Sequence, residues 1–137
     1  MFLSYTHRIF SASRRGDVKW VRKLQRTLMR SWSNKVLSVR RVTQDNQGKK
    51  TAGVDGVKSL PPVERLKLAG ELKLTGKSKP TRRVWIPKPG RDEKRPLGIP
   101  VMYERALQAV VKAALEPEWE AKFEANSYGF RLLLVCP

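Results

Sequence analysis

Apolar side chains recur every three or four positions in the N-terminal third of the chain. From Ser13 to Val42 they form one stripe, which is typical of an amphipathic helix or a pair of helices, and we expect this stripe to face the core. The stripe consists of Val18, Val21, Leu24, Leu28, Trp32, Val36 and Val39. The opposite side carries one acid, Asp17, and a row of cations that predicts a nearly continuous positive ridge: Lys19, Arg22, Lys23, Arg26, Arg30, Arg40 and Arg41.

Glycines and polar residues then interrupt the helical pattern. The segment from Gln47 to Gly56 contains three glycines and two lysines, which predicts a flexible basic loop in which nothing packs deeply. Farther on, Pro61-Pro62 opens a short helix that runs to about Leu72, because proline is tolerated in the first helical turn. We expect Leu66 and Leu72 of this helix to face the core.

The period of the pattern changes from helical to alternating near residue 81. Between Thr81 and Pro87, Val84 and Ile86 fall on one side and Arg83 and Trp85 on the other, which is the period of a strand. Pro89-Gly90 marks a turn, so the segments Arg82–Lys88 and Lys94–Pro100 are expected to pair as an antiparallel hairpin. Prolines in both segments favour edge strands.

A last helical pattern begins at Met102 and reaches Leu115, and we expect Pro117 to end it. This helix is expected to pack behind the hairpin. The elements together predict one α+β domain, with N-terminal helices, a basic loop and an antiparallel β-hairpin packed by the following helix.

The charge of the chain narrows the range of partners. Its 137 residues include 29 Lys and Arg against 12 Asp and Glu, a net charge of +17, and the pI is about 10.7. Such a balance is typical of nucleic-acid binding and less often of an anionic membrane surface. A membrane-spanning segment is not expected, because the longest apolar run, Leu132 to Val135, is far too short.

Cysteine and histidine are nearly absent. Cys136 and His7 are the single members of their kinds, so neither an intrachain disulfide nor a thiolate or imidazole metal cluster is expected. We therefore expect a reducing compartment, the cytoplasm in the first place. An organellar matrix or stroma stays open, because the first sixteen residues lack acids and have a composition that also fits a transit peptide.

The predicted hairpin concentrates the candidate chemistry. Its six cations would form an anion clamp on a stiff element, in which the planar guanidinium of arginine binds phosphate through two parallel hydrogen bonds. They are Arg82, Arg83, Lys88, Arg91, Lys94 and Arg95. The alternative is that they are solvated charges that protect exposed sheet edges from aggregation. Trp85 and Tyr103 are candidates to stack on bases, with buried packing as the alternative for each.

Catalytic groups are not recognisable in this sequence. None of the acids lies in an apolar strand that would desolvate a metal site, and the C-terminal glutamates are expected on a solvated helix face: Glu116, Glu118, Glu120 and Glu124. No glycine-rich loop has the spacing of a phosphate-binding loop of nucleotide hydrolases, and no nucleophile triad can be assembled. We predict a binding protein with no catalytic residue, no metal site and no cofactor of its own.

Four segments of the chain resemble group II intron reverse transcriptases and maturases, in the order in which that family has them. They are Asn46–Gly56, Pro80–Lys88, Arg95–Pro100 and Ser127–Arg131. The resemblance implies that residues 1–131 form the N-terminal, fingers domain of such an enzyme and that residues 132–137 are a divergent apolar tail. It has one conservative departure, since Glu104 precedes Arg105 where the family usually has Asp.

Several residue roles follow from the resemblance alone. The fingers of this family hold template, primer and incoming nucleotide, and the basic N-terminal part also contacts intron RNA. The resemblance implies that Lys88 and Arg95 grip the triphosphate of the nucleotide. It also implies that the loop from Lys49 to Gly56 closes over template and primer. Nucleic-acid contacts are therefore expected at Lys49, Lys50, Thr51, Gly53, Arg82, Arg83, Arg91 and Lys94.

The family continues after Arg131 with the strand that bears the first catalytic aspartate, but here Leu132–Pro137 follow. The resemblance thus implies that this polypeptide binds RNA, either group II intron-like or otherwise structured, and also DNA, without polymerase activity of its own. Mg²⁺ would enter only with a palm domain supplied in trans. Two alternatives stay open: half of a split reverse transcriptase completed by a chain with palm and thumb, or a subunit of a larger complex that docks through the former RNA-binding face.

Overall fold

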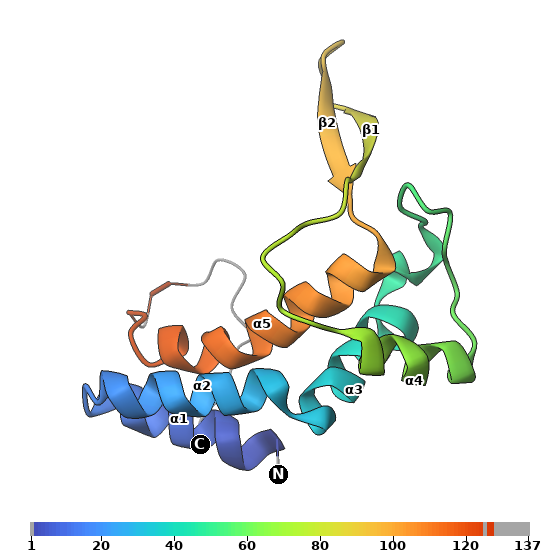
Figure 1. Cartoon of the computed structure of the whole chain (residues 1–137). Helices are drawn as coiled ribbons and strands as arrows, with labels where there is room; N and C mark the ends of the chain where they lie inside the picture. Colours follow the sequence, from blue (N-terminus) through green and yellow to red (C-terminus); the bar gives the residue numbers. More distant parts are fainter. Residues whose placement is uncertain (1, 125, 128–137) are drawn as a thin grey trace. The chain divides into compact units, whose positions relative to one another are not determined.

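The computed structural model describes residues 2–124, 126 and 127, and within them it is an α+β protein (Figure 1). The helices are α1 (Phe2–Arg14), α2 (Val18–Arg30), α3 (Trp32–Arg40), α4 (Pro62–Glu71) and α5 (Met102–Glu120). A π-helical turn, Arg41–Asp45, and a 3-10 turn, Gln47–Lys50, follow α3. Strands β1 (Arg82–Pro87) and β2 (Lys94–Ile99) form an antiparallel sheet. The predicted class is confirmed, whereas the predicted boundary after residue 131 lies outside the described residues.

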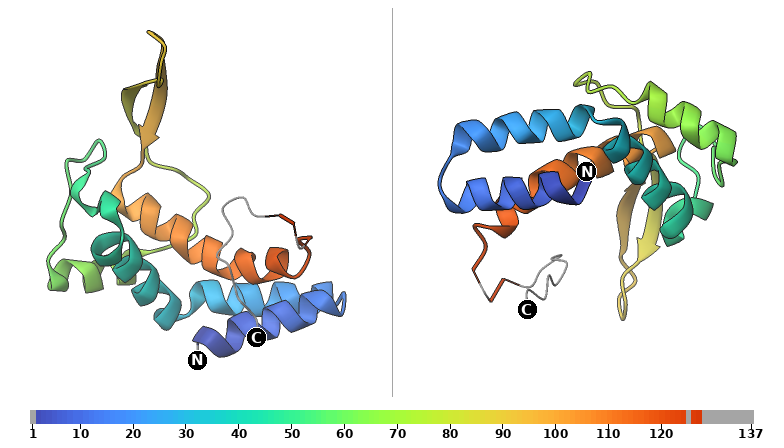
Figure 2. Two further views of the ribbon diagram at one scale, coloured as in Figure 1. Left: turned by 180° about the vertical axis from the view of Figure 1, so that it is seen from behind. Right: turned by 90° about the horizontal axis from the view of Figure 1, so that it is seen from below.

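The chain divides into two compact units, the first formed by residues up to Ser31 and from Val111 onward, the second by Trp32 to Val110. In the first unit, α1 and α2 lie side by side and antiparallel (Figure 2). Gly16 makes the turn between them with a φ of +73°, a conformation that glycine adopts without strain. The Asp17 carboxylate then accepts a hydrogen bond from the Trp20 amide at 3.0 Å and caps α2.

The core of the first unit differs in part from the prediction. It is built from Ile9, Ala12, Val21, Leu24, Leu28 and Ala114. Helix α1 was not predicted, although it supplies two of these side chains. Val18 and Trp32, expected in the core, are 51% and 55% exposed, because the helix breaks at both ends of α2 and the stripe does not continue across the breaks.

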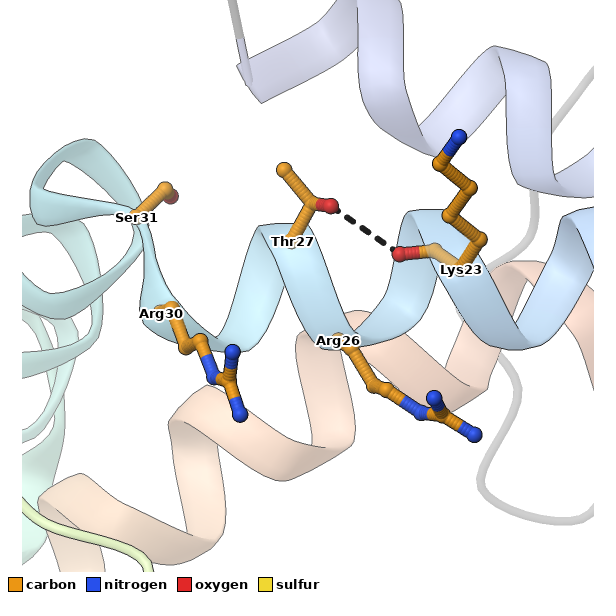
Figure 3. Close-up of a pocket in the computed structure, with 5 residues that line it drawn as sticks. All are labelled: Lys23, Arg26, Thr27, Arg30 and Ser31. Atoms are coloured by element: carbon orange, nitrogen blue, oxygen red, sulfur yellow. Dashed lines mark hydrogen bonds between the residues drawn. The ribbon is translucent and has the colours of Figure 1, made fainter.

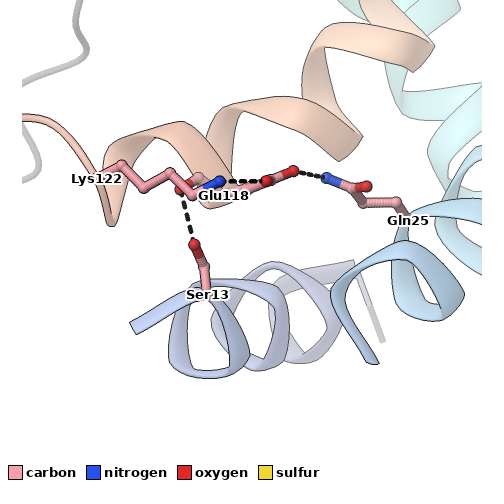
Figure 4. A network of polar contacts seen from close by, with 4 residues as sticks. All are labelled: Ser13, Gln25, Glu118 and Lys122. Carbon is pink, nitrogen blue, oxygen red and sulfur yellow. Dashed lines mark hydrogen bonds and ion pairs between the residues drawn. The ribbon is translucent and has the colours of Figure 1, made fainter. Parts of the chain in front are cut away.

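Helix α5 continues through Pro117 to Glu120, so the prediction that Pro117 ends it is wrong. Proline removes one backbone hydrogen bond, yet the last turn is held by contacts to other helices (Figure 4). The Ser13 hydroxyl donates to the Glu118 carbonyl at 3.0 Å, and the Gln25 amide donates to the Glu118 carboxylate at 2.7 Å. Glu118 also pairs with Lys122 and is half-buried, which corrects the expectation of a solvated face at this position.

In the second unit, α3 packs against α4 and the start of α5 is buried. Asn34 is fully buried, and its side-chain amide donates to the Val110 carbonyl at 3.2 Å. Helix α4 begins at its predicted proline and buries Leu68 and Ala69, and Leu72, the residue just after the helix, is buried as predicted. Leu66 is 57% exposed, contrary to prediction, because the neighbouring positions Leu68 and Ala69 turn toward the core instead.

The hairpin has the predicted strands, and its register pairs Val84 with Leu97 and Ile86 with Arg95. It extends from the N-terminal end of α5 (Figure 1). No residue of β1 or β2, all of which the structure describes, is buried. The following helix therefore does not cover the hairpin as extensively as the sequence predicted, since its buried side chains serve the helical core.

Candidate nucleic-acid interface

The exposed side of α2 carries the predicted positive ridge of the first unit. Lys23, Arg26 and Arg30, together with Thr27 and Ser31, line a shallow depression that is open to solvent (Figure 3). The Thr27 hydroxyl donates a hydrogen bond to the Lys23 carbonyl at 3.0 Å. Within the described residues no salt bridge is found for Lys23, Arg26 or Arg30, which leaves their charges available to an anion.

Aromatic residues stiffen part of this ridge. The Trp20 ring has Arg8 on it at 5.4 Å and Lys23 at 5.2 Å, measured from the cation to the ring centroid. Such cation–π contacts contribute about 0.5–1 kcal/mol at exposed sites and limit the freedom of the cation. Lys23 is thus partly ordered before any ligand arrives.

The basic loop of the second unit is more ordered than the sequence predicted. The Lys49 ammonium donates to the Gln44 carbonyl at 2.6 Å, while Lys50 and Thr51 are exposed. Gly53 is buried, and a Cβ built on it would lie 2.8 Å from the Cα of Val101. The prediction that nothing in this loop packs deeply is therefore wrong at Gly53, where the close approach of two backbones excludes a side chain.

Arg105, in the first turn of α5, fastens the loop. Its guanidinium donates to the carbonyls of Pro100 at 2.9 Å, Gly48 at 2.8 Å and Thr51 at 2.6 Å. The preceding residue, Glu104, is buried and accepts a hydrogen bond at 2.9 Å from the amide of Lys79, just before β1. These neighbours thus tie the start of α5 to both the basic loop and the base of the hairpin.

The sequence did not lead us to a role for Arg105, although its position in the first turn of a predicted helix is a signal. A cation in the first turn of a helix opposes the helix dipole, which favours negative charge at that end. An arginine at such a position indicates that carbonyl oxygens or an anion compensate it. Here three carbonyls do so.

The strand register sorts the predicted cations of the hairpin into two groups. Successive side chains of a strand point to opposite faces, and directly paired residues share a face. The first face, called here the Lys88 face, carries Arg82, Val84, Ile86 and Lys88, and opposite them Ile99, Leu97, Arg95 and Glu93. The second, the Trp85 face, carries Arg83, Trp85 and Pro87, and opposite them Gly98, Pro96 and Lys94.

The Lys88 face brings together the two residues for which a phosphate-binding role was expected. Lys88 lies opposite Glu93, and Arg95 lies opposite Ile86, so Lys88 and Arg95 are diagonal neighbours on one face. Arg82 shares that face one strand-length away, whereas Arg83 and Lys94 lie on the other face and Arg91 lies in the turn. The predicted clamp is thus two surfaces, and the role of each residue stays a prediction.

Tyr103 and Trp85 differ in their suitability for stacking. Tyr103 is half-buried, its hydroxyl accepts from the Lys73 amide at 3.2 Å, and the Lys79 ammonium lies 4.5 Å from its ring centroid. Trp85 is 56% exposed on a face where its paired neighbour is Pro96. Of the two, Trp85 has a ring available to a base.

Metal binding and membrane insertion find no support in the described residues. Among the described residues, no group of three or more His, Cys, Asp and Glu side chains is placed to hold a metal ion. None of the helices in that part of the chain is long and apolar enough to cross a membrane. The expected compartment stays a prediction.

Comparison with known proteins places the chain in a family. Residues 4–72, which are half of its length, match the N-terminal domain of reverse transcriptase. Over 99 residues it is 41% identical to Protein YkfC of Escherichia coli (strain K12), covering 66% of this chain and 25% of that protein. It is 33% identical over 132 residues to Maturase-like protein 1 of Euglena gracilis, covering 90% and 28%, respectively.

A third relative is the Group II intron-encoded protein LtrA of Lactococcus lactis subsp. cremoris, which is 40% identical over 57 residues, 42% of this chain and 10% of that protein. The chain spans about a quarter of the length of the first two relatives. The match covers α1 to α4 with the basic loop, and the similarity to a maturase-like protein covers nearly the whole chain. The chain therefore belongs to the reverse transcriptase N-terminal domain family and is similar to its group II intron and maturase members.

Proposed function

We propose that this chain binds RNA through the ridge of α2, the basic loop and the Lys88 face of the hairpin. The observation that carries the proposal is the register of the hairpin, which sets Arg82, Lys88 and Arg95 on one face of a two-stranded ribbon. Strand backbones lose little conformational freedom on binding, so the cations meet a phosphate backbone with part of the ordering cost already met.

The family relationship supports RNA as the polyanion. The names of two relatives describe them as a maturase-like protein and a group II intron-encoded protein. Group II intron-like or otherwise structured RNA is the ligand we propose, with DNA as a further one. Lys88 and Arg95 would take a phosphate group, which in a complete enzyme is that of the incoming nucleotide.

We further propose that the chain does not extend a primer by itself. Its similarity to the relatives covers only about a quarter of their length, and the sequence shows no carboxylate pair in a strand that could bind Mg²⁺. Mg²⁺ would be needed only when a second chain supplied a palm domain. Primer extension by the mixture, but by neither chain alone, would favour the split-enzyme alternative.

The alternative of a subunit that docks on protein makes a different prediction. Recovery of the same protein partner after nuclease treatment would favour it, because an RNA-bridged partner is lost when the RNA is digested.

The direct experiment compares charge with hydrogen-bond geometry on the Lys88 face. Binding of a fluorescein-labelled group II intron fragment is followed by fluorescence anisotropy for the full chain, for Arg82→Gln/Arg95→Gln and for Arg82→Lys/Arg95→Lys. The glutamine pair should weaken binding at least about ten-fold, since even one charge-assisted contact contributes about 1.5–3 kcal/mol. The lysine pair should lie between, because it keeps charge without the fork. Equal affinity of all three chains would contradict the proposed role of this face.

A further inference from the structure

An acid lies on the Lys88 face of the hairpin. The Lys88 ammonium forms an ion pair with the Glu93 carboxylate at 2.7 Å, across the turn that joins β1 to β2. The backbone supports this contact, because the Lys88 amide donates to the Glu93 carbonyl at 3.0 Å and so extends the ladder by one pair. Gly90, with a φ of +72°, lies within the turn and lets the chain reverse there.

Lys88 pairs with one of the two adjacent acids in the hairpin. The hairpin segment 82–95 holds six cations and two acids, Asp92 and Glu93, which are neighbours in sequence. Glu93 shares a face with Lys88 and Arg95, whereas no salt bridge involving Asp92 is found among the described residues. Of two adjacent carboxylates with equal charge, one therefore contacts the cation with an expected role in phosphate binding.

We propose that Glu93 is a stand-in for phosphate that holds Lys88 until RNA or a nucleotide displaces it. A phosphate oxygen that approached the Lys88 ammonium would meet a carboxylate 2.7 Å from the same nitrogen. Two anions held by one ammonium lie within a few ångströms of each other and repel, so binding of the phosphate favours departure of the carboxylate. Glu93 thus lowers the affinity of Lys88 for phosphate. Ligands with several negative charges compete best with the carboxylate, because they attract the ammonium more strongly.

The exposure of the pair makes such an exchange feasible. The two side chains are 40% and 65% exposed, so water solvates the carboxylate as it leaves. Exposed ion pairs are weak, and removal of this one corresponds to a gain in phosphate affinity of about two- to five-fold. The inference rests on the proposed function, because it presupposes that the hairpin binds a phosphate ligand.

The test compares Glu93→Gln with Asp92→Asn, each in the full chain and each again with Lys88→Gln. Both changes remove one negative charge at adjacent positions, so the aspartate variant reports the long-range effect of charge alone. The probe is a fluorescein-labelled oligouridylate at low salt, and circular dichroism spectra establish that every variant is folded.

We expect Glu93→Gln to bind the oligouridylate about two- to five-fold more tightly than Asp92→Asn, and this difference to vanish when Lys88 is glutamine. Equal binding by the two variants, a difference that survives Lys88→Gln, or weaker binding by Glu93→Gln would each overturn the inference while leaving the proposed function intact. Absence of oligouridylate binding by the unaltered chain would overturn the inference, and absence of binding to the group II intron fragment as well would overturn the proposed function.

Discussion

The Arg105 guanidinium donates a hydrogen bond of 2.8 Å to the carbonyl of Gly48, which lies 57 residues earlier in the chain. With the further bond to Thr51, this contact closes the basic loop onto the first turn of α5. The positions of Lys49 and Lys50 therefore depend on a residue that carries no predicted nucleic-acid contact.

Replacement of Arg105 by Gln should loosen the loop. We expect the free energy of unfolding to fall by about 2–3 kcal/mol, because carbonyls lose their charged donor. Hydrogen exchange of the Ser59 amide, which donates to the Lys49 carbonyl, should accelerate. Arg91→Gln, in the turn of the hairpin, is the control with the same chemical change. Unaltered exchange at Ser59 in Arg105→Gln would show that the arginine does not order the loop.

Gly53→Ala should destabilise the chain, whereas Gly70→Ala should not. A methyl group at residue 53 would meet the Val101 backbone at 2.8 Å, and relief of such a contact costs about 1–3 kcal/mol. Residue 70 has open space around it and lies in α4, where alanine is favoured over glycine by up to about 1 kcal/mol. Thermal denaturation should thus give opposite shifts of Tm. A shift of the same sign for both would refute the close packing at Gly53.

Trp85→Ala should weaken binding of single-stranded RNA, since stacking of a base on an aromatic ring contributes about 1–3 kcal/mol. Trp119→Ala is a matched control, because Trp119 is 50% exposed but the Lys122 ammonium already lies 5.0 Å from its ring centroid. Trp85→Phe should retain most of the affinity. If the alanine variants bind equally well, Trp85 is not a stacking platform.

Glu118 should make the stability of the first unit depend on pH. The hydrogen bond from Lys122 lowers the pKa of this carboxyl below its ordinary value of 4.5, and the bond from Gln25 adds to the effect, although burial opposes both. A carboxyl whose pKa is lowered by folding stabilises the fold above its unfolded-state pKa, and this stabilisation is lost as the pH falls through the lowered value.

We therefore expect Glu118→Gln to be less stable than the unaltered chain by about 1 kcal/mol at pH 7, with a difference that shrinks as the pH falls below 4.5. Denaturation by urea at several pH values measures it. Glu64→Gln, at an exposed carboxylate of α4, should change the stability by less than about 0.5 kcal/mol at pH 7. A difference for Glu118→Gln that grows toward acid pH would contradict the assigned sign.

The spacing of apolar residues along the chain predicted the strands of the hairpin and the buried side of α2. The alternation around Val84 and Trp85 gave the strand, and the stripe through Val21, Leu24 and Leu28 gave the buried side of α2. Helix α1 has a comparable stripe in Phe2, Tyr5, Ile9 and Ala12, but the acid-free composition of this segment also fits a transit peptide, so its helical pattern was ambiguous.

Features that depend on distant residues were not predictable in this way. Nothing near Pro117 in the sequence indicates that Ser13 and Gln25 hold the turn beyond it. The burial of Gly53 against Val101 and the three carbonyl partners of Arg105 likewise arise from the tertiary fold. The Lys88–Glu93 pair is different, since the hairpin register alone would have placed the two residues opposite each other.

The central claim is that clustered cations on α2, the basic loop and the hairpin make this chain an RNA-binding protein. Its most direct test is the affinity of the full chain for a labelled group II intron fragment over a series of salt concentrations. The account predicts a linear fall of the logarithm of the association constant with the logarithm of salt, and a slope of about −0.7 to −0.9 for each phosphate contacted. Affinity that stays constant from low to high salt would contradict it.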